Sequence, residues 1–537
     1  MGGISAAAEP ELIMPVRQRT PSDRVQQVVP LVLLAIGLIS SNRSVTFIND
    51  ESTIVGAAAD PLRTLVSGFF SGAGHLDHPP LYDILLHLWM RGTGGNFDYL
   101  RIPSVLFFIA ALLLLGRASR FLTGSKTGGS AVIWLGALWP FSFHFARLAS
   151  WYSFSFFLVA GLTLAYFKYL EAPDAARWTV LLLFSVCLVW TNYFGLAIIA
   201  CLAIDQLLRW RAKEPALTPN ALLGTAALVC VSFIPLMIAF RAEISRAANF
   251  HQGGVAILAN AAFNIFSLFV SESVAPWYWW LSVPAGLAVL LCILLVAWWI
   301  PPGARRYLIY AALLIVLMAL LGILQTNYLF PISAWVLLPV GVSIEAAKPR
   351  WATYGLAAAL LVIGLAGWYG VYSRRYYSAP RFIEPWQEVA SEASAKINGG
   401  ATVIADHPSF LLYLTYFLHA PRQDGAWVFE GLLPDAVKYP QVFSPAAWLA
   451  AGHPTSGKML LIRGDGDVAG NQPMDDAARQ LDGTCGSISS RLRMRDEGYR
   501  WKERFLPQLH TPQWRIEIRE YDCNSTNSKQ IYEIPPR

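Results

Sequence analysis

Long apolar runs separated by short polar segments dominate the first 372 residues. With their polar ends extended into the interface, these runs approach the roughly 17–25 residues that a helix needs to cross a bilayer. The pattern predicts a polytopic α-helical membrane domain over residues 28–372, with about eleven transmembrane helices. The predicted spans are Val28–Ser41, Pro103–Leu122, Ser130–Phe145, Trp151–Leu170, Thr179–Trp190, Tyr193–Leu208, Ala221–Phe240, Trp280–Ile300, Tyr307–Leu324, Tyr328–Ile344 and Trp351–Tyr372.

Two connections between these spans, residues 42–102 and residues 242–279, are much longer than the others. Long connections in a compact protein commonly carry function. In the first, the apolar stretch Pro79–Met90 is too short to span and holds Asp83 and His87, so it predicts a juxtamembrane or half-inserted helix. In the second, Val255–Phe266 is apolar but interrupted by asparagines, and it predicts an interfacial helix that could order over bound substrate.

Beyond residue 372 the long apolar runs stop. Helical periodicity over Pro385–Asn398 and Pro408–His419 alternates with strand-like segments at Thr402–Ala405, Met459–Ile462 and Arg515–Glu520. Residues 373–537 are therefore predicted to form a small soluble α/β domain. This domain has no glycine-rich phosphate loop, metal-ligand spacing or nucleophile elbow, so we expect it to bind the acceptor or to gate the site.

Composition agrees with this division. Hydrophobic residues make up 55% of the 537 residues and charged residues only 14%, which is too apolar for a soluble protein of this length. The net charge of +6 lies wholly in residues 1–372, which hold 22 basic and 16 acidic residues, whereas the rest holds 19 of each. The excess is thus not a surface for nucleic acid, and no nucleic-acid partner is expected.

The basic residues predict the orientation of the spans, because cytoplasmic segments are enriched in Lys and Arg. With residues 1–27 as a disordered cytoplasmic tail, the cytoplasmic segments contain 15 Lys and Arg, against seven on the other side. Eleven spans then place residues 373–537 outside the cytoplasm. Cys485 and Cys523 are the only cysteines of that domain, and an isolated extracytoplasmic pair favours a disulfide over two buried thiols. We expect an integral membrane protein.

The outer face of this topology collects the candidate chemistry. Asp50 and Glu51 follow the first span, His78 precedes the juxtamembrane helix, and Arg147 breaks the positive-inside bias between two spans. Taken singly, each has a plain alternative, such as a solvated loop pair, a helix cap or an arginine reaching lipid headgroups. Taken together, a carboxylate can accept the proton of a hydroxyl, and an arginine suits a departing phosphate. This combination fits glycosyl transfer from a lipid-linked sugar.

Six short motifs occur in order along residues 28–345. They are Asp50-Glu51, His78-Pro79-Pro80-Leu81-Tyr82, Arg101-Ile102-Pro103-Ser104, Ala146-Arg147 with Tyr152, Thr191-Asn192-Tyr193 and Tyr328-Leu329-Phe330-Pro331. This order resembles the GT-C fold membrane glycosyltransferases, most closely the bacterial relatives of protein O-mannosyltransferases and the lipid A aminoarabinose transferases. The resemblance implies a catalytic Asp in the first outer loop and a polyprenyl-phosphate sugar as donor.

Carried over by residue, the resemblance makes Asp50 the base or acceptor-positioning group and Glu51 its neighbour, with a supporting or metal-linked role. His78 would lie near the acceptor, and Arg147 with Tyr152 would bind the donor phosphate. The remaining substrate-binding candidates are Tyr82, Arg101, Asn192, Tyr193 and Tyr328.

The chain also departs from the family pattern. The segment after Arg147 lacks the acid that several relatives have there, and Asn327 stands where an arginine often precedes the tyrosine. A second carboxylate would then come from Asp77 or Glu272, and a replacement phosphate contact from Arg246 or Arg101.

Several questions stay open at this level. A divalent metal is a candidate cofactor, with Glu51, Asp77, His251 and Glu272 as candidate ligands. The acceptor is a lipid, a polysaccharide or a protein hydroxyl, and the expected partners are these molecules, the lipid donor and membrane lipids. The alternative function is a transporter or flippase, although such proteins usually show paired broken helices in repeated halves or ionisable groups deep in their spans. A non-catalytic assembly or sensor protein is a third alternative.

Overall fold

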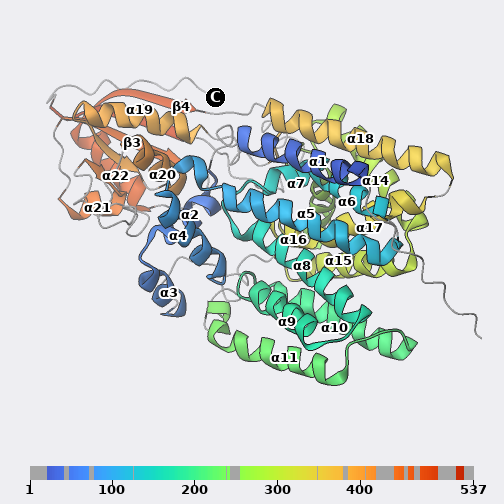
Figure 1. Cartoon of the computed structure of the whole chain (residues 1–537). Coiled ribbons are helices and arrows are strands. Elements are labelled where there is room, and N and C mark those ends of the chain that lie inside the picture. Colours follow the sequence, from blue (N-terminus) through green and yellow to red (C-terminus); the bar gives the residue numbers. More distant parts are fainter. Residues whose placement is uncertain are drawn as a thin grey trace, which may run out of the picture.

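The chain folds into a helical bundle with a smaller α/β domain at one end (Figure 1). The computed structural model describes residues 21–41, 47–71, 78–124, 126–237, 239–241, 254–347, 349–378, 385–405, 407–418, 441–452, 457–464, 472–493 and 516–524.

The bundle helices follow the predicted apolar runs, and each run coincides with one helix or with two consecutive ones. They are α1 (Pro21–Ser40), α5 (Ile102–Thr123), α6 (Lys126–Leu138), α7 (Pro140–Phe145), α8 (Trp151–Glu171), α9 (Ala175–Val189), α10 (Gly195–Ala212), α11 (Pro219–Phe233) with the 3₁₀ turn η3 (Ile234–Leu236), α14 (Trp279–Trp299), α15 (Pro302–Leu320), α16 (Thr326–Ile332), α17 (Ala334–Ala346) and α18 (Arg350–Ser373). Among the described residues, six helices are long and apolar enough to cross a membrane, or seven if the bent pair α16–α17 is one span. The polytopic helical architecture is therefore confirmed, while the number of eleven spans stays a prediction.

Aromatic side chains mark both ends of the antiparallel pair α14 and α18. Trp279 and Trp298 of α14 are 68% and 79% exposed, and Trp351 and Tyr372 of α18 are 65% and 67% exposed. At a rise of 1.5 Å per residue, each pair of rings is separated by about 30 Å along its helix. This spacing equals the thickness of a bilayer's hydrocarbon layer, with rings at both interfaces.

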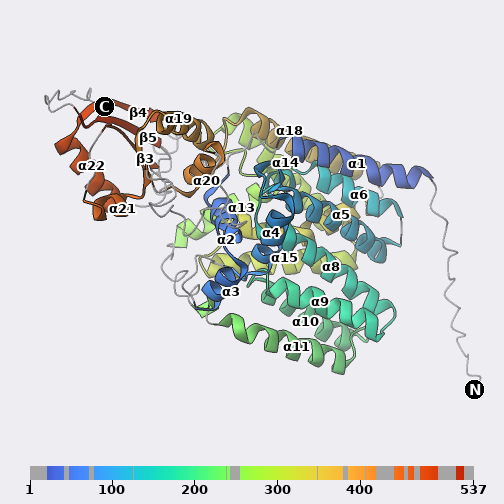
Figure 2. The same cartoon turned by 60° about the vertical axis from the view of Figure 1, so that its left-hand side comes forward.

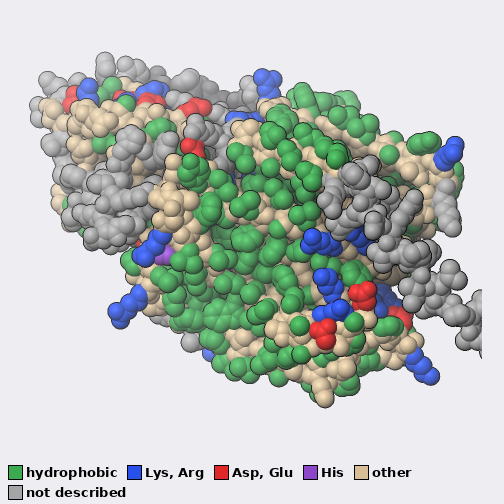
Figure 3. Space-filling view, in the orientation of Figure 1, with side chains coloured by type: hydrophobic (Ala, Val, Ile, Leu, Met, Phe, Trp, Pro, Cys, Tyr) green, Lys and Arg blue, Asp and Glu red, His purple; other side chains and the backbone are tan. Residues whose placement is uncertain are grey.

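The surface agrees with such a placement. Hydrophobic side chains cover most of the bundle face seen in Figure 3, and a group of charged side chains lies at the end remote from the α/β domain. At that end, Arg209 and Arg306 form ion pairs with Asp205 and Glu214, so two of the segments predicted to be cytoplasmic meet there.

Two elements refine the sequence expectations at the membrane boundaries. The stretch Pro79–Met90 forms a helix as predicted, α4 (Leu81–Thr93), and Val255–Phe266 lies within the longer helix α13 (Gly254–Val270). The prediction of a disordered tail to residue 27 is wrong for its last residues, because α1 already begins at Pro21. Proline suits the first helical position, since its fixed φ fits the helix and its missing N–H is not needed there.

The described residues of the connection 42–102 form three further elements. Besides α4, they are α2 (Asn49–Ala59), α3 (Leu62–Ser71) and the 3₁₀ turn η2 (Phe97–Tyr99). The helix α2 packs against α4 within this loop and against α20 of the α/β domain (Figures 1 and 2).

The α/β domain contains one five-stranded sheet. Its elements are α19 (Trp386–Asn398), β1 (Thr402–Ala405), α20 (Pro408–Phe417), β2 (Val442–Phe443), α21 (Pro445–Ala450), β3 (Lys458–Gly464), α22 (Gln472–Thr484), β4 (Gly486–Arg493) and β5 (Ile516–Asp522). The strand order is β2-β1-β3-β5-β4, with β1 parallel to both neighbours and β5 antiparallel to β3 and β4. Cys485 and Cys523 form the predicted disulfide.

Candidate active site

The turns predicted to lie on the outer side meet at one end of the bundle, next to the α/β domain. The hydroxyl of Tyr152, at the start of α8, donates to Asp50 Oδ2 at 2.8 Å and accepts from Asn327 Nδ2 at 3.0 Å. Three segments far apart in the sequence thus converge on one phenol. Asp50 is only half-buried, and among the described residues Tyr152 is its one hydrogen-bond donor.

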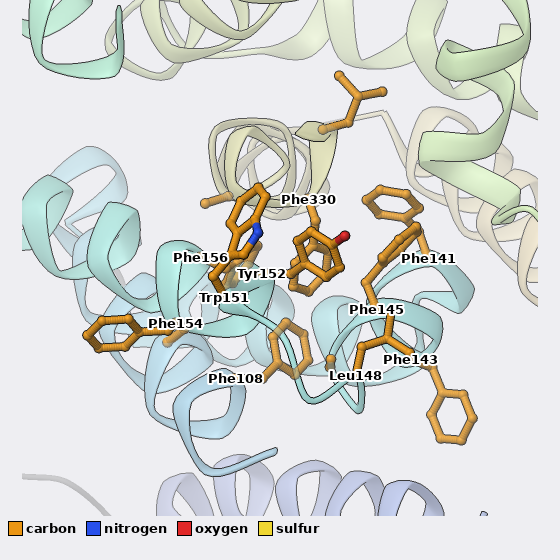
Figure 4. Close-up of a cluster of buried hydrophobic side chains, with 14 of the residues drawn as sticks. Phe108, Phe141, Phe143, Phe145, Leu148, Trp151, Tyr152, Phe154, Phe156 and Phe330 are labelled. Carbon is orange, nitrogen blue, oxygen red and sulfur yellow. The ribbon is translucent and has the colours of Figure 1, made fainter. Parts of the chain in front are cut away.

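Aromatic packing holds Tyr152 in place. The ring of Phe145 lies edge-on to Tyr152 at 5.9 Å, and Phe330 of α16 contacts Phe145 at 5.7 Å and Phe156 at 5.1 Å between ring centroids. Figure 4 shows these rings gathered around the turn between α7 and α8. Close-packed rings restrict side-chain rotation, so the Tyr152 hydroxyl has a fixed position.

Glu51 lies next to Asp50 but has a different environment. It is fully buried, and Arg101 binds it with two hydrogen bonds, Nε to Oε1 at 2.8 Å and Nη2 to Oε2 at 2.7 Å. Its Oε1 also accepts from the Ala149 N–H at 2.7 Å, and its Oε2 accepts from the Ile48 N–H at 3.3 Å. Glu51 therefore fastens the first turn of α2 to α5 and to the turn before α8.

Arg147 is a buried cation that is only partly paired. It is fully buried, its Nη1 donates to Ser41 Oγ at 3.1 Å, and its guanidinium lies 5.2 Å from the centre of the Phe143 ring. Within the described part of the chain, its Nε and Nη2 are buried and have no hydrogen-bond partner. Burial lowers the pKa of Arg147 to about 10, so the side chain is still charged at neutral pH.

One hydrogen bond joins the segment that carries Arg147 to the helix that carries Asp50. Arg147 is two residues before Ala149, whose N–H binds Glu51, and Glu51 directly follows Asp50. A buried donor with unused N–H groups is costly unless a partner completes it, so Arg147 is a candidate for binding an anion.

His78 and Tyr328 border the same region. The His78 Nε2 atom lies 3.2 Å from Asp83 Oδ2, and the His78 ring lies 5.9 Å from that of Trp151. Trp151 in turn stacks on Tyr328, with ring centroids 5.9 Å apart. The two aromatic rings beside Tyr152 are of the kind that packs on sugar faces.

Three sequence candidates have other surroundings. Tyr82 is fully buried and hydrogen-bonded to Ser104 at 3.0 Å, and burial raises its pKa. The Asn192 side chain accepts from the Phe194 N–H at 2.9 Å and so closes its own turn. Tyr193 packs on the ring of Phe240 at 5.0 Å, within a separate apolar cluster.

The metal candidates do not converge among the described residues, which contain no group of three or more His, Cys, Asp or Glu suited to a metal ion. The Glu51 oxygens are occupied by Arg101 and by two backbone N–H groups. Glu272 is buried and its carbonyl accepts from the Ser378 N–H at 2.9 Å. Asp77 and His251, like Arg246, lie outside the described residues.

Sequence reasoning missed Asn327 and Ser41 as contacts of the site. Asn327 was visible as the polar residue before Tyr328, in an outer turn, but it counted only as a missing arginine. Ser41 ends the first span, where a serine carries no distinguishing signal.

Comparisons with known proteins place this arrangement in a known fold. No model of a protein family matches the sequence, and no curated protein is similar to it. The structure is similar to that of ArnT from Cupriavidus metallidurans in the apo state, with a TM-score of 0.55 at 11% identity, over 92% of this chain and 97% of that one. The same protein bound to undecaprenyl phosphate gives a TM-score of 0.53 at 11% identity, over 92% and 98%. The chain has the GT-C fold of these proteins.

Proposed function

We propose that this chain is a membrane glycosyltransferase that moves a sugar from a polyprenyl-phosphate donor to a hydroxyl group of an acceptor outside the cytoplasm. The observation that carries the proposal is that one short segment, residues 147–152, holds both charged groups. Asp50, a half-buried carboxylate with spare acceptor capacity, accepts from Tyr152 of this segment, and Arg147 at its start is a buried cation with two unused nitrogens. The fold supports it, since an ArnT structure of the same fold binds undecaprenyl phosphate.

In this reaction the acceptor oxygen attacks the anomeric carbon of the sugar. A new carbon–oxygen bond forms while the bond from that carbon to the phosphate oxygen breaks, and the leaving group is the polyprenyl phosphate. Asp50 takes the proton of the hydroxyl, and the Tyr152 hydroxyl holds the carboxylate in place. Arg147 neutralises the charge that grows on the departing phosphate.

Glu51 is a positioning residue in this mechanism. Both of its oxygens are engaged by Arg101 and by backbone N–H groups, so it has little capacity left to accept a proton. Asp50 is therefore the better candidate for the base. His78 and the rings of Trp151 and Tyr328 border the region in which the sugar and the acceptor would meet.

The disulfide between Cys485 and Cys523 supports the location of the acceptor. Disulfides persist in oxidising compartments, so the α/β domain and the site beside it would face the periplasm of a bacterial inner membrane. Lipids, polysaccharides and protein hydroxyls are all acceptors of this kind.

Replacing Asp50 tests the proposal. In proteoliposomes supplied with a polyprenyl-phosphate sugar and acceptor, we expect Asp50→Asn to lower the transfer rate about 10²–10⁴-fold, the usual contribution of a general base. Asp98→Asn changes another acid of the same loop and should retain the wild-type rate. If Asp50→Asn transfers sugar at the wild-type rate, Asp50 is not the base. A wild-type protein that transfers no sugar but moves substrate across the liposome would instead be a transporter.

A further inference from the structure

One helix of the α/β domain contacts the helix that carries Asp50. The strand β1 lies between β2 and β3 in parallel pairing, and α20 begins three residues after β1 ends. Carboxyl ends of parallel strands are where α/β sheets usually position functional groups, at the point where the chain reverses its direction across the sheet. Here the helix that follows the carboxyl end of β1 is α20, and it packs against α2 (Figures 1 and 2).

Among the described residues, this interface includes two side-chain hydrogen bonds and one ring contact. The Ser52 hydroxyl donates to Ser409 Oγ at 3.3 Å, and the Phe47 N–H donates to the Tyr413 hydroxyl oxygen at 2.9 Å. The Phe47 and Tyr413 rings also meet edge-on, with centroids 5.8 Å apart. All four residues are buried, so these bonds are shielded from water.

Further contacts link Tyr413 to the first turn of α2, which carries Asp50 and Glu51. The Arg101 guanidinium lies over the face of the Phe47 ring, 4.1 Å from its centre, and forms a cation–π contact. Arg101 binds Glu51 through both carboxylate oxygens, and Glu51 directly follows Asp50 in the first turn of α2. Tyr413 thus fixes the residue on which the Arg101–Glu51 pair rests.

We propose that α20 is part of the active site, with Tyr413 as a positioning residue that holds the start of α2 and so orients Asp50. The proposal rests on the proposed function for its catalytic consequence, but the docking of α20 on α2 is testable without it. The α/β domain then acts as a support that sets the turnover rate, rather than as a separate binding module. Tyr413 stays protonated at working pH, because burial raises its pKa to about 12.

A pair of tyrosine variants separates positioning from general stability. Tyr413→Phe keeps the ring but removes the oxygen that accepts the Phe47 N–H. Tyr521→Phe removes another tyrosine hydroxyl of the same domain, which donates to Asp482 of α22 at 2.8 Å and does not contact α2. Amide hydrogen exchange of the full-length protein should then show faster exchange over residues 47–59 in Tyr413→Phe, and wild-type exchange there in Tyr521→Phe. Equal exchange of this segment in both variants would refute the docking.

Turnover provides the second readout. We expect Tyr413→Phe to lower kcat about fivefold with the donor KM unchanged, because the phosphate contacts of Arg147 are not altered, and Tyr521→Phe to leave both constants unchanged. A rise in KM with constant kcat would contradict a role in orienting Asp50.

A crosslink makes the test independent of the hydroxyl. Ser52→Cys with Ser409→Cys places two sulfur atoms where the hydroxyl oxygens are 3.3 Å apart, and the disulfide is detected by mass spectrometry after proteolysis. The oxidised protein should keep wild-type turnover, and the same crosslink should restore the kcat of Tyr413→Phe. Inactivation on oxidation, reversed by reductant, would show that the active state is undocked. Failure of wild-type transfer would refute the proposed function alone, since exchange and crosslinking still report the docking.

Discussion

The two ends of the helical bundle each bury an ionic cluster, and the clusters differ in how fully their hydrogen bonds are satisfied. At the end remote from the α/β domain, Asp205 accepts from the Tyr166 and Tyr310 hydroxyls and from Arg209, and Arg306 lies 3.5 Å away. At the other end, Arg147 donates to Ser41 Oγ and lies near Tyr377, and its Nε and Nη2 have no hydrogen bond of good geometry in the described residues.

This difference separates a structural role from a functional one. A buried charge whose bonding capacity is used up ties helices together, as Asp205 does for α8, α10 and α15. A buried charge with unused donors lowers the stability of the protein unless a ligand binds those donors. Such a residue is therefore expected at a ligand-binding site. Within the cluster next to the α/β domain, Glu51 is of the first kind and Arg147 fits the second.

The largest effect that follows concerns activity. Arg147→Met removes the charge while keeping much of the apolar stem, and we expect transfer from the lipid donor to fall about 10²–10³-fold, the range for losing a donor that stabilises developing charge. Arg209→Met removes a partly buried arginine from the other cluster and should leave the specific activity of the folded protein unchanged. Initial rates in proteoliposomes at equal amounts of folded protein provide the measurement. Equal losses in the two variants would show that the comparison does not distinguish their roles.

Stability should respond in the opposite sense. Arg209→Met leaves Asp205 without one of its cations and Glu214 without one of its partners, so we expect a loss of about 3 kcal/mol. Arg147→Met removes a buried cation with unsatisfied nitrogens and should be neutral or stabilising. Thermal unfolding of both purified variants in detergent measures this directly. A clear destabilisation by Arg147→Met would mean that its contacts in the empty site are already complete.

The sequence predicted those features of the fold that leave a local signal. Apolar runs such as Trp151–Leu170 stand out because a lipid-facing helix is apolar along its whole length. The pairing of Cys485 with Cys523 followed because the α/β domain has no other cysteine. The strand β4 was missed because its serines and arginines carry almost no hydrophobic alternation, and only pairing with β5 makes it a strand.

The candidate site was predictable as a set of polar groups at one end, but its internal contacts were not. The residues Asp50, Arg147 and Tyr152 share that end as the topology requires. The bond from Glu51 to Arg101 joins residues 50 positions apart, and that from Phe47 to Tyr413 joins residues 366 apart. Such pairings depend on tertiary packing, so local patterns could not distinguish Glu51, whose oxygens are fully engaged, from Asp50, which keeps acceptor capacity.

The smallest predicted effect is the stabilisation by bound polyprenyl phosphate, and it tests whether the Nε and Nη2 of Arg147 bind the phosphate. If polyprenyl phosphate binds to Arg147, it binds only the folded state. At a concentration of about 100 Kd it should therefore raise the free energy of unfolding by about 2.7 kcal/mol. Thermal unfolding with and without the lipid should show this gain in the wild type and in Arg209→Met, and no gain in Arg147→Met. A polyprenyl alcohol of the same length, which lacks the phosphate, is the control for the apolar tail. If the alcohol stabilises as well as the phosphate, the tail and not Arg147 supplies the binding energy, and the anion site must be sought elsewhere on the outer end.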